Sequence, residues 1–152
     1  MTEFARLMSD YFVKYLAGQK GSGSNTMKTY RDTFVQLLEF MDEKKHIRAD
    51  CIEVDSFSYD IINEFLEYLE KEKRVSISTR NNRLAAIRSF FKYTGYHEPK
   101  YLNISTSIRE ISKKKTEGRQ MNYLSVNAME HFLNSFDKTD HKELRCFCIV
   151  LL

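Results

Sequence analysis

Residues 78–95 read STRNNRLAAIRSFFKYTG, a stretch that combines an apolar helical stripe with a polar, basic face. Leu84, Ile87, Phe90 and Phe91 recur at the spacing of one side of an α-helix. The remaining positions carry short polar or basic side chains, and Ala85 among them is small enough to allow close approach of another molecule. Ser78 is expected to cap this helix and Gly95 to end it.

The start of this predicted helix concentrates groups that bind nucleic acids. Hydroxyls and amides bond to phosphates and base edges, and arginine offers a fork that suits phosphate or guanine. A helix N-terminus adds free N–H groups and positive potential. The candidate DNA contacts here are Ser78, Thr79, Arg80, Asn81, Asn82 and Arg83, with Arg88 further along the same helix. An ordinary capped terminus with a solvated basic face would explain the same residues.

Three more helices are predicted upstream. The first carries a stripe from Phe4 to Leu16 and ends at Gly18, and a flexible loop follows at residues 21–24. The second begins at Ser24-Asn25-Thr26, which offers N-cap oxygens. The third is capped by Ser58 and has an acidic outer face. A connector between the second and third is expected to bury Ile47, Ile52, Val54 and Phe57.

The start of the second helix resembles that of the fourth in composition. Its candidate DNA contacts are Thr26, Lys28, Thr29 and Arg31. N-cap chemistry alone would account for residues 24–26, so the paired occurrence on two helices is what suggests a shared surface.

The composition changes after His97. Residues 98–120 hold the single proline and few apolar residues, and we interpret them as an extended basic linker. Lys113, Lys114, Lys115 and Arg119 suit a strand that crosses a phosphate backbone, although a solvated linker has the same composition. Residues 121–152 then open two further helical patterns, one at Leu124-Ser125 and one near Leu144. The second stops within an apolar stripe, which predicts a domain that continues further.

Charge is unevenly distributed along the chain. The net charge is only +3, yet residues 50–72 hold eight acids and one base, and residues 73–97 hold six bases and no acid. Such segregation suggests one surface that faces an anion. Two solvated helix faces that attract each other are the alternative.

Several classes of function find no support in the sequence. No apolar run approaches the ~20 residues that span a membrane, and the N-terminus lacks the pattern of a signal peptide. The three cysteines show no disulfide framework, so a cytoplasmic location is expected. Cys146 and Cys148 are interpreted as small core residues rather than zinc ligands. No nucleophile–base constellation and no phosphate-binding glycine loop is visible, so neither a catalytic residue, a metal nor a cofactor is predicted.

The serial arrangement resembles the N-terminal core-binding domain of tyrosine recombinases, the phage integrase family. The resemblance runs from SNTMKTYRDTFVQLLEFM through IINEFLEYLEKE and STRNNRLAAIRSFFKYTG to YLSVNAMEHFLNSF. It implies an all-α fold: a four-helix SAM-like bundle over 1–97, a basic interdomain linker over 98–120, and two helices of a truncated catalytic domain over 121–152.

The resemblance also implies a function. The second and fourth helices would face the major groove of double-stranded DNA at a recombination site, next to other recombinase protomers. The catalytic residues of the family would lie beyond Leu152, so this chain would bind DNA without cutting it. A helical protein–protein interaction module that uses the acidic third helix, and a small DNA-binding regulator without recombinase activity, are the competing hypotheses.

Overall fold

The computed structural model describes residues 2–116, 125–137 and 139–151, and all regular elements in these ranges are helical. The chain divides into two compact units, Met1–Thr116 and Glu117–Leu152. The all-α class expected from the sequence is confirmed.

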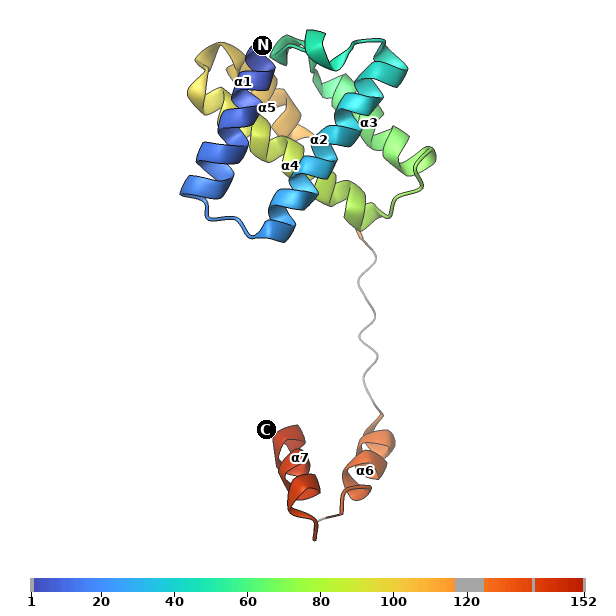
Figure 1. The fold of residues 1–152 in the computed structure, drawn as a ribbon. Coiled ribbons are helices and arrows are strands. Elements are labelled where there is room, and N and C mark those ends of the chain that lie inside the picture. The colour runs from blue at the N-terminus through green and yellow to red at the C-terminus, as the bar shows by residue number, and fades with distance from the viewer. Residues whose placement is uncertain (1, 117–124, 138, 152) are drawn as a thin grey trace. The chain divides into compact units, whose positions relative to one another are not determined.

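The first unit is a bundle of helices (Figure 1). Its long elements are α1 (Glu3–Asp10), which continues as a π-helical segment η1 (Tyr11–Gln19), α2 (Ser24–Lys45), α3 (Tyr59–Lys71), α4 (Ile77–His97) and α5 (Leu102–Glu110). Short 3₁₀ turns η2 (Ala49–Cys51) and η3 (Val54–Ser56) connect α2 to α3, and η4 (Pro99–Tyr101) connects α4 to α5.

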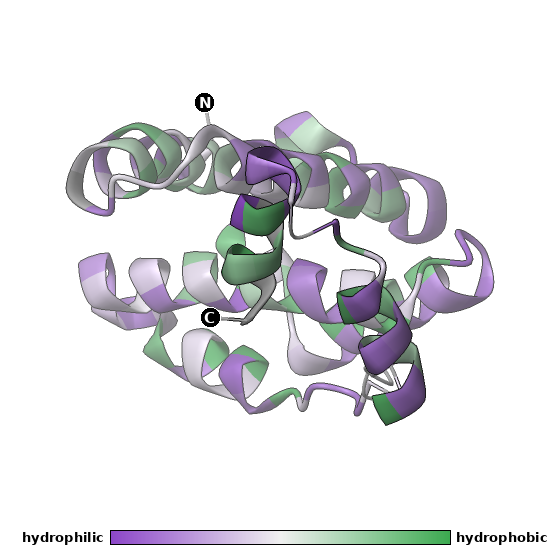
Figure 2. Cartoon of the chain, turned by 90° about the horizontal axis from the view of Figure 1, so that it is seen from below, coloured by the Kyte–Doolittle hydropathy of each residue, from purple (hydrophilic) through white to green (hydrophobic). Residues whose placement is uncertain are grey.

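One continuous apolar core holds the bundle together, and it uses the positions that periodicity predicted. Hydrophobic and hydrophilic residues alternate along the helices, as Figure 2 shows. The predicted stripe of α4 is fully buried, and Ile52, Val54 and Phe57 of the connector are buried with it. Ile47 packs against the same core from the side. Aromatic side chains supply much of this core, with Phe90 in edge-to-face contact with Phe4, Tyr11, Phe34 and Phe91.

A buried tyrosine links the π-helical segment to α4. The Tyr11 hydroxyl donates a hydrogen bond to Ser89 Oγ at 2.9 Å. Burial of the phenol raises the pKa of Tyr11 above its ordinary value. The polar face of α4 is thus fixed against η1 at Ser89.

The predicted linker is wrong over residues 98–111. Residues 102–110 form α5, and Tyr101, Ile108 and Ile111 are buried in the core of the first unit. The apolar residues Tyr101, Ile104, Ile108 and Ile111 follow helical spacing, and this spacing packs α5 against α4 and α3. The bundle therefore includes a fifth α-helix, and the chain leaves it only after Ile111.

Both predicted ends of α4 also need correction. Ser76 caps the helix, because its Oγ accepts a hydrogen bond from Thr79 N at 3.2 Å, and Ser78 is the second residue of the helix. Gly95 does not end the helix, which continues to His97. Instead Gly95 is buried where α4 meets Ser105 of α5.

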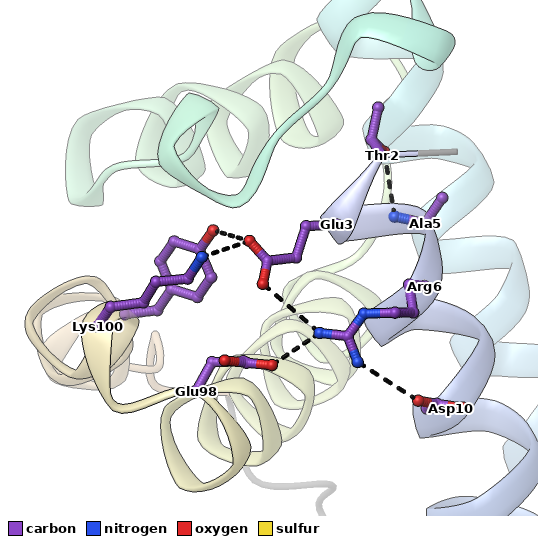
Figure 3. Close-up of polar contacts among 8 residues, drawn as sticks. Thr2, Glu3, Ala5, Arg6, Asp10, Glu98 and Lys100 are labelled. Atoms are coloured by element: carbon purple, nitrogen blue, oxygen red, sulfur yellow. Dashed lines mark hydrogen bonds and ion pairs between the residues drawn. The ribbon is translucent and has the colours of Figure 1, made fainter.

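Polar contacts fasten α1 to the segment that follows α4 (Figure 3). Glu3 accepts hydrogen bonds of 2.6 Å from Lys100 Nζ and from the Tyr101 hydroxyl. Arg6 donates to Glu98 at 2.7 Å on the same side of α1. The N-terminal helix is therefore joined by polar contacts to residues 98–101.

The second unit contains α6 (Val126–Asn134), capped by Ser125, and α7 (His141–Leu151). Phe136 contacts both Phe132 and Phe147. No described side chain in these two helices is fully buried. Cys148 is exposed, so its interpretation as a core residue is wrong, because α7 has no layer packed over that side chain among the described residues.

Candidate functional site

The N-terminal halves of α2 and α4 enclose a shallow groove that is lined mainly by polar residues. The groove has a volume of about 290 Å³ and is lined by Asn25, Thr26, Thr29, Tyr30, Asn82 and Ala85. Hydroxyl, amide and phenol groups from two helices therefore surround one opening, and Ala85 at its side leaves room for a close approach. The structure brings the predicted polar starts of the second and fourth helices together.

Arg83 sets the spacing of the two helices at this groove. Its Nη1 donates to Thr29 O at 2.9 Å and to Thr33 Oγ1 at 3.1 Å. Thr33 is completely buried, and its own hydroxyl donates to Thr29 O at 2.8 Å. Arg83, predicted as a DNA contact, thus braces α4 against α2 with one of its nitrogens.

Basic side chains without an acidic partner lie on the same two helices as the groove. Within residues 2–116, Lys28, Arg88 and Lys92 form no ion pair, and Arg31 has only the neighbouring Asp32 at 3.7 Å. Arg88 and Lys92 follow Ala85 along one face of α4, at the spacing of successive turns. Lys113 and Lys115 are exposed and likewise unpaired in this range. These cations keep their charge available to an anion.

On the acidic side of the bundle, in contrast, three lysines are paired with carboxylates. Lys44 pairs with Glu72 at 2.9 Å and Lys71 with Glu67 at 2.7 Å, and Lys45 pairs with Glu64. The Lys44 ammonium also lies over the ring of Tyr68. These three lysines therefore have less charge available to an external anion than the unpaired cations of α2, α4 and the segment after Ile111.

Two predicted contacts on α4 turn away from the groove. The Arg80 side chain is only 7% exposed, and its Nε lies 2.8 Å from Glu70 Oε1 of α3. Asn81 donates from Nδ2 to Lys114 O at 2.8 Å and accepts from Lys114 N at 3.1 Å. Both side chains face α3 and the chain that leaves the bundle.

Most of the other predicted contacts are exposed, and two of them form hydrogen bonds within their own helix or with its cap. Thr26, Lys28, Arg31, Ser78 and Asn82 are exposed, and the hydroxyl of Thr29 donates to Asn25 O at 2.9 Å. Thr79 Oγ1 lies 3.0 Å from the cap Ser76 Oγ. Arg119 lies outside the described residues.

Sequence reasoning left Lys92, Tyr30 and Glu70 out of the candidate site. Lys92 follows Arg88 by one helical turn, so the face periodicity would have found it. Tyr30 packs partly against the core, and it also lines the groove because it is only half-buried. Nothing in the sequence around Glu70 indicated its role, since its partners Arg80 and Lys114 come from other elements.

A larger hollow of about 570 Å³ lies elsewhere, between α2 and η2, with Val35, Leu38 and Asp42 in its lining. None of the predicted contacts lines it. In the described part of the chain, no three His, Cys, Asp or Glu side chains are grouped as metal ligands would be. No helix in that part is long and apolar enough to cross a bilayer.

Comparison with known proteins identifies this helical bundle. Residues 10–99 match the family described as phage integrase, N-terminal SAM-like domain. The bundle is thus a SAM-like all-α domain, as predicted. The chain belongs to the phage integrase N-terminal SAM-like domain family.

Relatives named as recombinases extend the match. The chain is similar to the putative integrase/recombinase y4rC of Sinorhizobium fredii, with 28% identity over 135 residues, which cover 89% of this chain and 41% of the relative. A second relative, y4rD of the same organism, is 32% identical over 111 residues, covering 73% of this chain and 40% of the relative.

The tyrosine recombinase XerC of Natranaerobius thermophilus is 28% identical over 124 residues, covering 82% of this chain and 39% of the relative. The chain therefore spans about two fifths of the length of these relatives. No solved structure matches the chain significantly.

Proposed function

We propose that this chain binds double-stranded DNA through the groove between α2 and α4, as the N-terminal part of a tyrosine recombinase. The observation that carries the proposal is the distribution of unpaired cations. Lys28 and Arg88 follow the groove-lining Thr26 and Ala85 along their helices, and Lys92 lies one turn beyond Arg88, whereas Lys44, Lys45 and Lys71 on the α3 side are ion-paired. Duplex DNA offers closely spaced phosphates to such cations and base edges to such hydrogen-bonding groups.

The roles within the groove follow from exposure. Lys28, Arg31, Arg88 and Lys92 would bind phosphates, which position the domain without reading sequence. Asn82 and Thr26 are exposed at the opening, so they would reach base edges. Arg83 would act indirectly, because its guanidinium holds the two helices at a fixed spacing.

The cleavage chemistry that the relatives' names imply is assigned in this proposal to other parts of the recombinase. This chain spans about two fifths of those relatives. Within its described residues we assign neither a nucleophile nor a general base. Other protomers of the same recombinase on one DNA site are the protein partners that this proposal includes.

Fluorescence anisotropy on a labelled duplex, measured across a salt series, tests the proposal. The variant R88A/K92A removes two unpaired cations, and the matched control K44A/K71A removes two cations that are paired with Glu72 and Glu67. Each phosphate contact contributes about −0.9 to the slope of log K against log salt, so R88A/K92A should flatten the slope by about 1.8. The control should leave the slope close to that of the unaltered chain.

Two results would overturn the proposal. One is the absence of salt-dependent binding of the unaltered chain to any duplex, including a recombination site. The other is equal flattening of the slope by both double variants, which would show that only net charge matters. A circular dichroism melt of each variant establishes that the bundle is still folded.

A further inference from the structure

The segment that leaves the bundle after Ile111 is held by side chains of two helices. Arg80 Nη1 donates to Ser112 O at 3.3 Å, and Asn81 forms two hydrogen bonds with the backbone of Lys114. Lys114 Nζ pairs with Glu70 Oε2 at 2.7 Å. Because Glu70 also pairs with Arg80, these contacts form one connected set, which we term the exit clamp (Glu70, Arg80, Asn81, Lys114).

The clamp holds a stretch that has no other attachment. Ile111 is the last buried residue before the end of the unit, and residues 112–116 are exposed and without regular structure. An exposed stretch of this kind gains conformational entropy when it is released, so its fixed course depends on specific contacts. Asn81 replaces the backbone partners that a helix or strand would provide for Lys114.

The clamp also distinguishes the three consecutive lysines. Lys114 is turned to Glu70, while Lys113 and Lys115 are exposed and, within residues 2–116, have no acidic partner. Asn81 lies one residue before Asn82, which lines the polar groove. The segment therefore emerges beside the start of α4, as Figure 1 shows, on the side of that helix that faces α3.

We propose that Asn81, Glu70 and Arg80 are positioning residues that fix the exit segment against the first turn of α4, so that Lys113 and Lys115 are held ready to bind DNA phosphates. The inference rests on the proposed DNA-binding function. Anchoring lowers the cost of ordering two long side chains and their backbone when DNA binds. Asn81 and Arg80 thus act on DNA through the lysines that they position.

Asn81→Ala is the sharpest test, because it removes both hydrogen bonds to Lys114 and leaves the Glu70–Arg80 pair intact. Asn82→Ala is the matched control, since it alters an exposed neighbour with no bond to the exit segment. Exchange of the Lys114 amide proton, followed by NMR without DNA, should accelerate in N81A and stay unchanged in N82A. This readout is independent of any DNA binding, so it tests the clamp even if the proposed function fails.

A double-mutant cycle with K113A/K115A then tests the consequence for DNA. Affinity should fall about fivefold in N81A, given the usual cost of ordering side chains at an interface. In the K113A/K115A background, N81A should cause no further loss, whereas N82A should lower affinity in both backgrounds. A full additional loss from N81A in that background, or an unchanged Lys114 exchange rate in N81A, would overturn the inference.

Discussion

Gly95 of α4 lies against Ser105 of α5 so closely that a Cβ on Gly95 would come within 2.8 Å of both Cβ and Oγ of Ser105. Real Cβ atoms essentially never approach a neighbour this closely, and Ser105 Cβ is fixed to the backbone of α5. The absence of a side chain at residue 95 is therefore what lets α5 pack on α4. Through α5 it also fixes where the exit segment begins.

Gly95→Ala should therefore destabilise the chain. Overpacking of a tight contact costs about 1–3 kcal/mol, and the better helix propensity of alanine offsets about 1 kcal/mol of that. We expect a net loss of about 1 kcal/mol in the free energy of unfolding, measured by urea denaturation. Gly18→Ala is the control, because its nearest neighbour, Val13 O, lies at 3.6 Å and the new methyl group has space.

The double variant G95A/S105G checks the cause of this loss. Without the Ser105 side chain, the close contact is gone, so adding G95A to S105G should lower the free energy of unfolding less than G95A does in the unaltered chain. If G95A were as stable as the unaltered chain, the close approach of α4 and α5 would be refuted.

The network around Glu3 predicts a dependence of stability on pH. Hydrogen bonds from Lys100 and then from Tyr101 hold the pKa of Glu3 below its ordinary value of 4.5. A carboxyl whose pKa is depressed by folding stabilises the fold above its unfolded pKa. That contribution is lost as the pH falls through the folded pKa. We therefore expect the advantage of the unaltered chain over Glu3→Gln to be full at neutral pH, to decline as the pH falls below 4.5, and to be lost only below the folded pKa of Glu3.

Thermal unfolding from neutral pH to strongly acidic buffer measures this difference. Glu39→Gln is a suitable control, because Glu39 is exposed and makes no hydrogen bond or ion pair within residues 2–116. A Glu3→Gln difference that persisted unchanged in acid would mean that the ion pairs of Glu3 contribute nothing to folding.

The sequence predicted the core well because burial leaves a periodic pattern. The stripe of α4 and the connector anchors Ile52, Val54 and Phe57 were assigned correctly. The helix α5 was missed although Tyr101, Ile104, Ile108 and Ile111 follow helical spacing. Asparagine, serine and threonine between them have low helix propensity, and packing against α4 overrides it.

The candidate site was predicted in outline but not in its details. The polar starts of α2 and α4 do meet in one groove, and this could be expected from their similar composition. The burial of the Arg80 side chain could not be expected from the sequence, because it depends on the ion pair with Glu70 from another helix. The N-cap of α4 was ambiguous in the sequence, since Ser76 and Ser78 both precede the apolar stripe of this helix.

The exposed apolar side chains of the second unit lead us to expect that the 152-residue chain self-associates more than residues 1–116. Val126, Phe132 and Ile149 expose 74%, 43% and 62% of their surface, so α6 and α7 present apolar side chains to solvent. Exposed apolar groups of this kind drive association between copies. We expect light scattering to show association of the 152-residue chain that rises with concentration, and to show a monomer for residues 1–116. F132K/I149K in the full chain should reproduce the effect of the deletion without shortening the chain.

Because the first unit has its own core, its unfolding midpoint should be the same in the 152-residue chain and in residues 1–116. Association that persisted in residues 1–116 would instead place the contact on the bundle itself.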